Sequence, residues 1–290
     1  MSSARPTTRF IGTLTALFAG ALMALAVLVT PSSAEAGHDL RYEDDRMVQY
    51  EIDKRSRRVI DDCHDRYRHR LKTQHKRLGT IPRTTQVLIA RGIQADRLDL
   101  PDSLRVLDLS GSNIKDLRNI PRNLEVLLLE DTNIEHIRNI PRGLKVLDLS
   151  GSNVEYIRNL PRSLRYLDLS NTNVEYIRNL PRGLRGLDLS HTRIRYIRNL
   201  PYSLRTLDLS HNDIDYIRNI PNQVRALDLS HTNVTNLRNL PESLRFLNLE
   251  GTRIERLYGL PNGVRYLNVR DTAVPPDDLP EDVRRVVAGS

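Results

Sequence analysis

Apolar residues recur along most of the chain in a unit of 20 residues. The unit from Leu160 to Asn179 reads L-P-R-S-L-R-Y-L-D-L-S-N-T-N-V-E-Y-I-R-N, and its apolar positions are filled in nearly every other copy. A proline marks each of nine copies, at positions 101, 121, 141, 161, 181, 201, 221, 241 and 261. A fixed period of this length is typical of a repeat protein in which each unit stacks on the next.

Each unit predicts one short β-strand. Leu167 and Leu169 alternate with Tyr166, Asp168 and Ser170, which is the period of two of a strand with one buried face. The rest of the unit is short and contains a proline, so we expect an extended or polyproline-like return segment instead of a helix. Successive strands would stack at about 4.8 Å in a parallel sheet, and each unit would bury its apolar side chains only against its neighbours.

Leu164, Leu167, Leu169 and Val174 resemble the L-x-x-L-x-L-x-x-N-x-L signature of the leucine-rich-repeat family, and the resemblance extends from about Pro101 to Pro280. It implies an α/β-type solenoid dominated by β structure, a leucine-rich-repeat arc with one short parallel strand per repeat. The short unit with Leu-Pro at each junction also resembles the compact repeats of bacterial secreted proteins.

One departure from the family pattern is systematic. The family's buried asparagine is replaced by a hydroxyl residue in most units, and a true asparagine stands only at Asn212; the hydroxyl residues are Ser112, Thr132, Ser152, Thr172, Thr192, Thr232, Thr252 and Thr272. Because a hydroxyl makes fewer hydrogen bonds than an amide, we expect less complete satisfaction of the turn backbone. A second polar column is a candidate to satisfy some of these backbone groups, and it comprises Asn119, Asn139, Asn159, Asn179, Asn199, Asn219 and Asn239.

The N-terminal segment, residues 1–36, has the three regions of a secretory signal. Arg5 and Arg9 precede an apolar run from Phe10 to Val29, and small residues follow up to Ala36. We expect cleavage after Ala36, export to the periplasm or the exterior, and no transmembrane span in the mature chain. The apolar run is nearly long enough to cross a bilayer, so an uncleaved anchor is the alternative.

The remaining boundaries follow the repeat. Val59, Cys63, Tyr67 and Leu71 have a four-residue spacing that predicts a charged amphipathic helix, so we expect an N-terminal helical cap over 37–80. Residues 81–100 form a degenerate first repeat and 101–280 the nine regular repeats. Residues 281–290 form a truncated terminal repeat, in which 283–286 predicts a last strand.

Charge favours acidic partners without requiring them. The chain has 44 Lys and Arg against 36 Asp and Glu, a formal net charge of +8, and only five of the 44 basic residues are Lys. Arginine pairs bidentately with carboxylate or phosphate, so lipid phosphates, anionic polysaccharide or nucleic acid could bind, although net charge also simply maintains solubility. Cys63 is the only cysteine, which excludes an internal disulfide.

The side of the strands away from the leucines is the candidate binding face, concave in the expected arc. One column varies in size, with small residues between aromatic ones, and three units add a histidine after the strand. The candidate patch comprises Tyr166, Asp168, Gly186, Asp188, His191, Thr206, Asp208, His211, Ala226, Asp228, His231, Phe246 and Tyr266. Exposed aromatic walls around a depression favour a binding site, although recent duplication of repeats would give the same coincidence.

The aspartate column, from Asp148 to Asp228 in steps of 20, places like charges about 5 Å apart. We expect the arginine column at 165, 185, 205, 225, 245 and 265 to neutralise it. A divalent cation bound by the Asp row, with or without the His row, is the alternative, but regular spacing alone makes no coordination shell. We therefore predict no metal and no cofactor.

A further set of basic and aromatic residues lies outside the strand. Arginines at 118, 138, 158, 178, 198, 218 and 238 form one column, and tyrosines at 156, 176, 196 and 216 precede four of them by two positions. This composition is that of a polyanion surface. The simpler interpretation is a stabilising row of stacked Tyr and Arg side chains on the return side.

No catalytic arrangement is predicted. Asp188, Ser190 and His191 contain the residue types of a triad, but neighbours on one strand cannot converge on one reacting atom. Cys63 falls on the apolar stripe of its expected helix, which favours a buried role. We therefore expect a non-enzymatic exported scaffold that binds a protein or glycan and has no small-molecule substrate. A polyanion-binding envelope protein and a structural envelope component are the alternatives.

Overall fold

The computed structural model describes residues 70–73, 80–94, 98–275, 279 and 284–286. All of them belong to one compact unit of the chain, Leu40–Ser290. The expected signal (1–36), the cysteine and most of the expected helical cap (37–80) lie outside the described residues and stay predictions.

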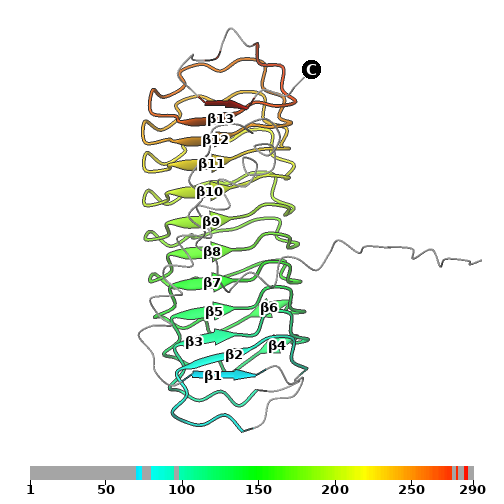
Figure 1. Ribbon diagram of the computed structural model, residues 1–290, viewed down its shortest axis with the longest axis vertical. Coiled ribbons are helices and arrows are strands. Elements are labelled where there is room, and N and C mark those ends of the chain that lie inside the picture. Colours follow the sequence, from blue (N-terminus) through cyan, green and yellow to red (C-terminus); the bar gives the residue numbers. More distant parts are fainter. Residues whose placement is uncertain (1–69, 74–79, 95–97, 276–278, 280–283, 287–290) are drawn as a thin grey trace, which may run out of the picture. The chain divides into compact units, whose positions relative to one another are not determined.

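The described residues form stacked coils, where a coil is one 20-residue repeat carrying one short strand (Figure 1). Twelve strands form one parallel sheet in the order β1-β2-β3-β5-β7-β8-β9-β10-β11-β12-β13-β14. Their bounds are β1 Arg70–Thr73, β2 Val87–Ala90, β3 Val106–Asp108, β5 Val126–Leu128, β7 Val146–Asp148, β8 Tyr166–Asp168, β9 Gly186–Asp188, β10 Thr206–Asp208, β11 Ala226–Asp228, β12 Phe246–Asn248, β13 Tyr266–Asn268 and β14 Arg284–Val286. The prediction of one parallel strand per repeat is confirmed.

The return segments contain no helix anywhere in the described ranges, as expected from their length and proline. Two of them pair as a small parallel sheet, β4 (Asp116–Leu117) with β6 (His136–Ile137). Each coil turns back toward its strand at the proline, where the Pro161 carbonyl accepts a hydrogen bond from Leu164 N at 3.1 Å and the other coils repeat this bond. The proline therefore opens a tight turn that leads directly into the strand.

The helix expected over 37–80 is wrong at its C-terminal end. Residues Arg70–Thr73 form strand β1, which pairs with β2 in the register Arg70↔Val87. A strand here satisfies the backbone groups along the open edge of β2, a gain that a helix at this position would not provide. At the other end of the sheet, the predicted last strand is confirmed at Arg284–Val286, which pairs with β13.

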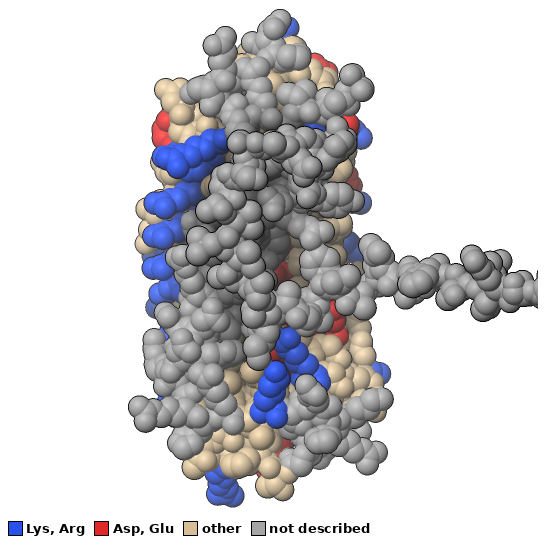
Figure 2. Space-filling model, in the orientation of Figure 1, with Lys and Arg blue, Asp and Glu red and all other residues tan. Residues whose placement is uncertain are grey.

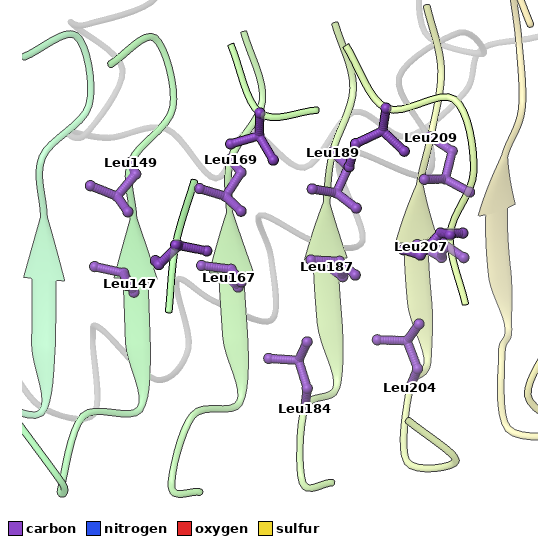
Figure 3. Close-up of a cluster of buried hydrophobic side chains, with 14 of the residues drawn as sticks. Leu147, Leu149, Leu167, Leu169, Leu184, Leu187, Leu189, Leu204, Leu207 and Leu209 are labelled. Carbon is purple, nitrogen blue, oxygen red and sulfur yellow. The ribbon is translucent and has the colours of Figure 1, made fainter. Parts of the chain in front are cut away.

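Leucine side chains from successive coils fill the interior of the stack (Figure 3). Leu164, Leu169 and Val174 are fully buried, and Leu167 is 1% exposed. In Figure 3 their equivalents, such as Leu187 and Leu207, lie directly beside one another in neighbouring coils. Full burial of one such side chain stabilises the fold by about 1.5–3 kcal/mol, and the neighbouring coils provide most of that burial.

The hydroxyl residues of the turn bond mainly within their own coil. Thr132, Thr172 and Thr232 each donate to the carbonyl three residues earlier, at 2.8, 2.6 and 2.6 Å. Asn212 does more, because its Nδ2 lies 2.7 Å from Leu189 O and its Oδ1 accepts from Thr192 N at 3.1 Å. The amide therefore links two coils, whereas these three threonines each bond a single carbonyl.

A second kind of side-chain hydrogen bond between coils occurs in every other coil of the stack. The Ser203 hydroxyl lies 2.6 Å from both Arg182 O and Leu184 O of the preceding coil, and Ser163 and Ser243 repeat this arrangement. In the coils between them the equivalent residues are Gly183 and Gln223. From residue 163 onward, coils with and without this serine follow one another.

The second asparagine column has a conformational role. Residues 139, 159, 179, 199, 219 and 239 have φ of 55–56°, in the left-handed region that asparagine tolerates better than most residues. In the part of the chain that the structure covers, none of these side chains donates to a buried backbone group, so the proposed share in satisfying the turn is wrong. Among the described residues, no helix could cross a lipid bilayer.

Candidate binding surface

The sheet brings the predicted strand residues into one continuous column. Tyr166 pairs with Gly186, Gly186 with Thr206, Thr206 with Ala226, Ala226 with Phe246, and Phe246 with Tyr266. Their expected exposure is wrong, because all are buried except Phe246, which is half-buried.

Packing along the column explains part of this burial. A Cβ atom added to Gly186 would lie 2.8 Å from Tyr166 Cδ1 and 3.1 Å from Thr206 Oγ1. The rings of Phe246 and Tyr266 lie 6.4 Å apart in a tilted arrangement. Large side chains thus lean over their small neighbours, and the depression expected at Gly186 is filled by the ring of Tyr166.

The aspartate column is also more buried than expected. Asp188 is fully buried, Asp208 and Asp228 are 4% exposed, and Asp168 is half-buried. Each carboxylate turns back to its own strand end, where Asp208 Oδ1 accepts hydrogen bonds from Ser210 N at 2.9 Å and Ser210 Oγ at 2.7 Å. The same pair of bonds recurs at Asp148, Asp168, Asp188 and Asp228.

Burial and neighbouring carboxylates change the protonation of this column. Desolvation, followed by the charge of Asp228, raises the pKa of Asp208 to about 8. Desolvation and the neighbouring Asp188 and Asp148 raise the pKa of Asp168 well above its ordinary value. Asp208 therefore holds a proton near neutral pH, which lowers its repulsion with the neighbouring carboxylates.

The arginine column was expected to neutralise the aspartates, but two of its members, Arg165 and Arg245, bond to their own coils. Arg165 Nη1 donates to Arg162 O and Leu164 O of its own coil, each at 3.2 Å. Asp228, the last aspartate of the column, accepts from Asn248 Nδ2 at 2.9 Å. Asp108, which lies before the column, is paired with Arg91 Nε at 2.7 Å. The arginines of the column lie at the start of the strands, and the carboxylates lie at their end.

The three histidines form an exposed stack in the turn after the strand. The ring centroids of His191 and His211 are 4.0 Å apart, and those of His211 and His231 are 4.4 Å apart. Partial burial, with the neighbouring His191 and His231, lowers the pKa of His211 to about 4. Their φ values of 51–55° place them in the same left-handed position that glycine or asparagine fills in other coils.

The stacked rings do not form a metal site. Face-to-face imidazoles direct their nitrogens side by side, so they do not converge on one ion. Among the described residues, no group of three His, Cys, Asp or Glu side chains could hold a metal ion.

The triad suggested by residue type is not assembled either. The Ser190 hydroxyl donates to Asp188 Oδ1 at 2.8 Å, and the His191 ring stacks on the next histidine. A nucleophile needs its hydroxyl proton directed at the base, and here the proton is directed at the carboxylate.

The return side carries the predicted tyrosine and arginine rows. Tyr156, Tyr176, Tyr196 and Tyr216 are 37–52% exposed, and the arginine two residues later lies over each ring, 5.0–5.3 Å from its centroid. The contact is therefore a cation–π pair within one coil. An open groove of about 1010 Å³ runs between two coils here, lined by Tyr176, Arg178, Arg182, Tyr196, Arg198 and Tyr202 among others.

Sequence analysis did not predict that arginines of the column at the start of the strands are exposed and lie apart from the aspartates. Arg185, Arg225 and Arg265 are exposed. Figure 2 shows basic side chains in a continuous stripe along the edge where the strands begin. The arginines were recognised as a column, but their distance from the aspartates depends on which end of the strand each column occupies.

Comparisons with known proteins agree with this architecture. Residues 203–216 match a family model described as leucine-rich repeat. Among solved structures, YopM from Yersinia enterocolitica WA-314 is similar with a TM-score of 0.62 and 25% identity, over 74% of this chain and 53% of that one. The chain thus spans about half the length of that protein. A search of curated proteins gave no match.

Two other solved structures share the fold. The leucine-rich effector protein YopM from Yersinia pestis has a TM-score of 0.58 and 21% identity over 82% of both chains. The functional domain of InlJ from Listeria monocytogenes has a TM-score of 0.53 and 16% identity over 70% of this chain and 57% of that one. The 20-residue repeat, the stacked parallel strands and these similarities together show that the chain has the leucine-rich-repeat fold.

Proposed function

We propose that this protein is an exported, non-enzymatic scaffold that binds a partner protein through the sheet side of its coils and the adjoining histidine stack. The observation that carries the proposal is the register of the sheet, in which the same residue of each coil lies beside its equivalent in the next. In the turn after the strands, this register gives the three exposed histidines a rigid and regular spacing, and solenoid proteins bind extended partners through such regularly spaced side chains.

The accessible part of the predicted patch supports contact at the turn. His191, His211 and His231 are exposed and stacked, so their ring edges are ordered before any partner arrives. Preordered aromatic side chains lose little conformational entropy on binding. The strand residues beside them would position the histidines and add contact area where the partner reaches them. Export is supported by the signal-like residues 1–36.

A binding experiment with two matched triple variants tests this proposal. The full chain, its His191→Asn/His211→Asn/His231→Asn variant and a Tyr176→Ala/Tyr196→Ala/Tyr216→Ala variant would each be used to capture partners from envelope and host extracts. Asparagine suits the left-handed turn, so the first variant keeps the fold. Affinity for each identified partner would then be measured with purified protein at two salt concentrations.

We expect the histidine variant to lose at least 10-fold in affinity, and the tyrosine variant to bind as the unchanged chain does. Binding through specific contacts should tolerate moderate salt. Loss with the tyrosine variant alone would move the site to the return side, and unaltered affinity in both variants would end the proposal.

A further inference from the structure

A row of arginines runs across six consecutive coils at the start of the strands. It comprises Arg165, Arg185, Arg205, Arg225, Arg245 and Arg265, and from Arg185 onward each N–H donates to the carbonyl of the preceding arginine at 2.7–2.9 Å. The backbone therefore fixes these residues one strand spacing apart, about 4.8 Å. Like charges repeated along one edge repel one another, so a bound anion would relieve this repulsion.

Two arginines of the row fold back on their own coils. Arg245 Nη1 donates to Glu242 O at 3.1 Å and Leu244 O at 2.7 Å, and Arg165 makes the equivalent bonds. Both occupy the space beside a glycine of the next coil, Gly263 and Gly183, where a Cβ atom would collide with the guanidinium. These two arginines are held on their own backbone.

Arg185, Arg225 and Arg265 behave differently. All three are exposed, and within the described structure their guanidinium groups make no hydrogen bond or ion pair. The basic residue at the same position one coil before the row, Lys145, is paired with Glu125 at 2.5 Å. The three arginines are therefore available guanidinium groups repeated every second coil, about 10 Å apart.

We propose that Arg185, Arg225 and Arg265 bind a linear anionic polysaccharide that lies across the coils. A polymer with an anionic group on successive sugars matches a row of separate, regularly spaced cations. The guanidinium fork binds sulfate or carboxylate oxygens bidentately. This surface is distinct from the histidine stack at the other end of the strands, so the inference does not depend on the proposed protein partner.

Single-stranded nucleic acid fits this row less well. Proteins that bind it combine basic residues with aromatic side chains on which the bases stack. The aromatic residues that follow an arginine of the row, Tyr166, Phe246 and Tyr266, are buried or half-buried. The row offers charge without a stacking surface, which favours a saccharide whose anionic groups project outward.

Two triple variants with the same change in charge provide the test. Arg185→Gln/Arg225→Gln/Arg265→Gln removes the free arginines, and Arg138→Gln/Arg178→Gln/Arg198→Gln removes three exposed arginines from the return side. Binding of heparin, of polygalacturonate and of a dT oligonucleotide to the full chain would be measured by calorimetry from 20 to 300 mM salt. Circular dichroism would check that every variant is folded.

We expect the first variant to lose at least 10-fold in heparin or polygalacturonate affinity at low salt, and to reduce the slope of log K against log salt by about one unit for each lost contact. The return-side variant should keep most of the affinity. Heparin binding alone would identify sulfate as the recognised group, and polygalacturonate binding would identify carboxylate. Equal losses in both variants, no binding of either polysaccharide at 20 mM salt, or tighter binding of the oligonucleotide would overturn the inference.

Discussion

Two positions of the coil require a left-handed backbone, and this requirement decides which residues occupy them. The first position, in the turn after the strand, contains Gly111, Asp131, Gly151, Asn171, His191, His211, His231, Gly251 and Asp271. The second contains the asparagines from 139 to 239 and Gly259. For most other residues, this conformation costs about 1–2 kcal/mol. The histidines therefore meet a requirement of the backbone, in addition to any contact that they make with a partner.

Substitutions at Asn199 would measure this requirement. Asn199→Gly should leave the free energy of unfolding nearly unchanged, whereas Asn199→Ala should lower it by about 1 kcal/mol, because φ is 55° at this residue. Urea denaturation provides the measurement. At Asn236, which is exposed and has no positive φ, alanine should be tolerated at least as well as glycine. The same order of stability at both positions would contradict a conformational role for Asn199.

The sequence contained a signal for this role that a search for binding residues did not use. Along the column, every residue other than the three histidines is Gly, Asn or Asp, which are the residues typical of a left-handed turn. The stacking of the three rings could not be predicted in the same way. It depends on the rotamers of neighbouring coils and on the 4.0 and 4.4 Å spacing between their rings.

At the scale of the strand, the most unusual feature is the aspartate column of β7 to β11, which is buried in β9, β10 and β11. Asp208 holds a proton between about pH 4 and pH 8 in the folded chain, because its pKa is raised to about 8 from an unfolded value near 3.9. The unfolded chain has released that proton over the same range. The contribution of Asp208 to stability is therefore most favourable at the acid end and becomes less favourable as pH rises through this window.

Asp208→Asn tests this pH dependence. Asparagine can still accept from Ser210, as Asn248 accepts from Glu250 N at 3.2 Å in its own coil. The quantity to compare is the free energy of unfolding of the variant minus that of the unchanged chain. This difference should be higher at pH 8 than at pH 5 by at least about 1.4 kcal/mol, the equivalent of one pKa unit. Urea denaturation at the two pH values gives the difference, and Asp215→Asn, on an exposed residue, is the control. Identical pH dependence for Asp208→Asn and the unchanged chain would refute it.

The elements themselves were largely predictable, but their exposure was not. The period of two correctly assigned Leu167 and Leu169 to the interior and gave the strand of each coil. It does not say how closely side chains on the outer face pack, and that face is buried at Tyr166 and Asp188. The four-residue spacing that ended at Leu71 predicted a helix, but pairing with β2 made a strand of Arg70–Thr73.

At the scale of the whole array, stability depends on contact between neighbours. The interior is one continuous cluster of leucine, isoleucine and valine side chains that runs from Leu88 to Leu279 in the described residues. No coil in it has a separate core. A repeat protein of this kind is expected to unfold over many coils together.

Leu187→Ala would measure this coupling. The leucine is fully buried in β9, so its loss should lower the free energy of unfolding by about 2–5 kcal/mol. Far-ultraviolet circular dichroism and tyrosine fluorescence should shift to the same lower urea midpoint, because the coils unfold together. Tyr202→Ala, on a residue that is 69% exposed, is the control and should cost little. Two separate transitions would show that the coils on either side of β9 unfold independently.

The alternation of Ser163, Gly183, Ser203 and their successors has a consequence for how such a protein can change length. Each serine binds the coil before it, and Gly183 and Gly263 leave room for the folded arginine of the coil before them. Removing or duplicating one coil would place two of the same kind side by side. Evolutionary growth of this part of the gene would therefore be least disruptive in steps of about 40 codons, two repeats at a time.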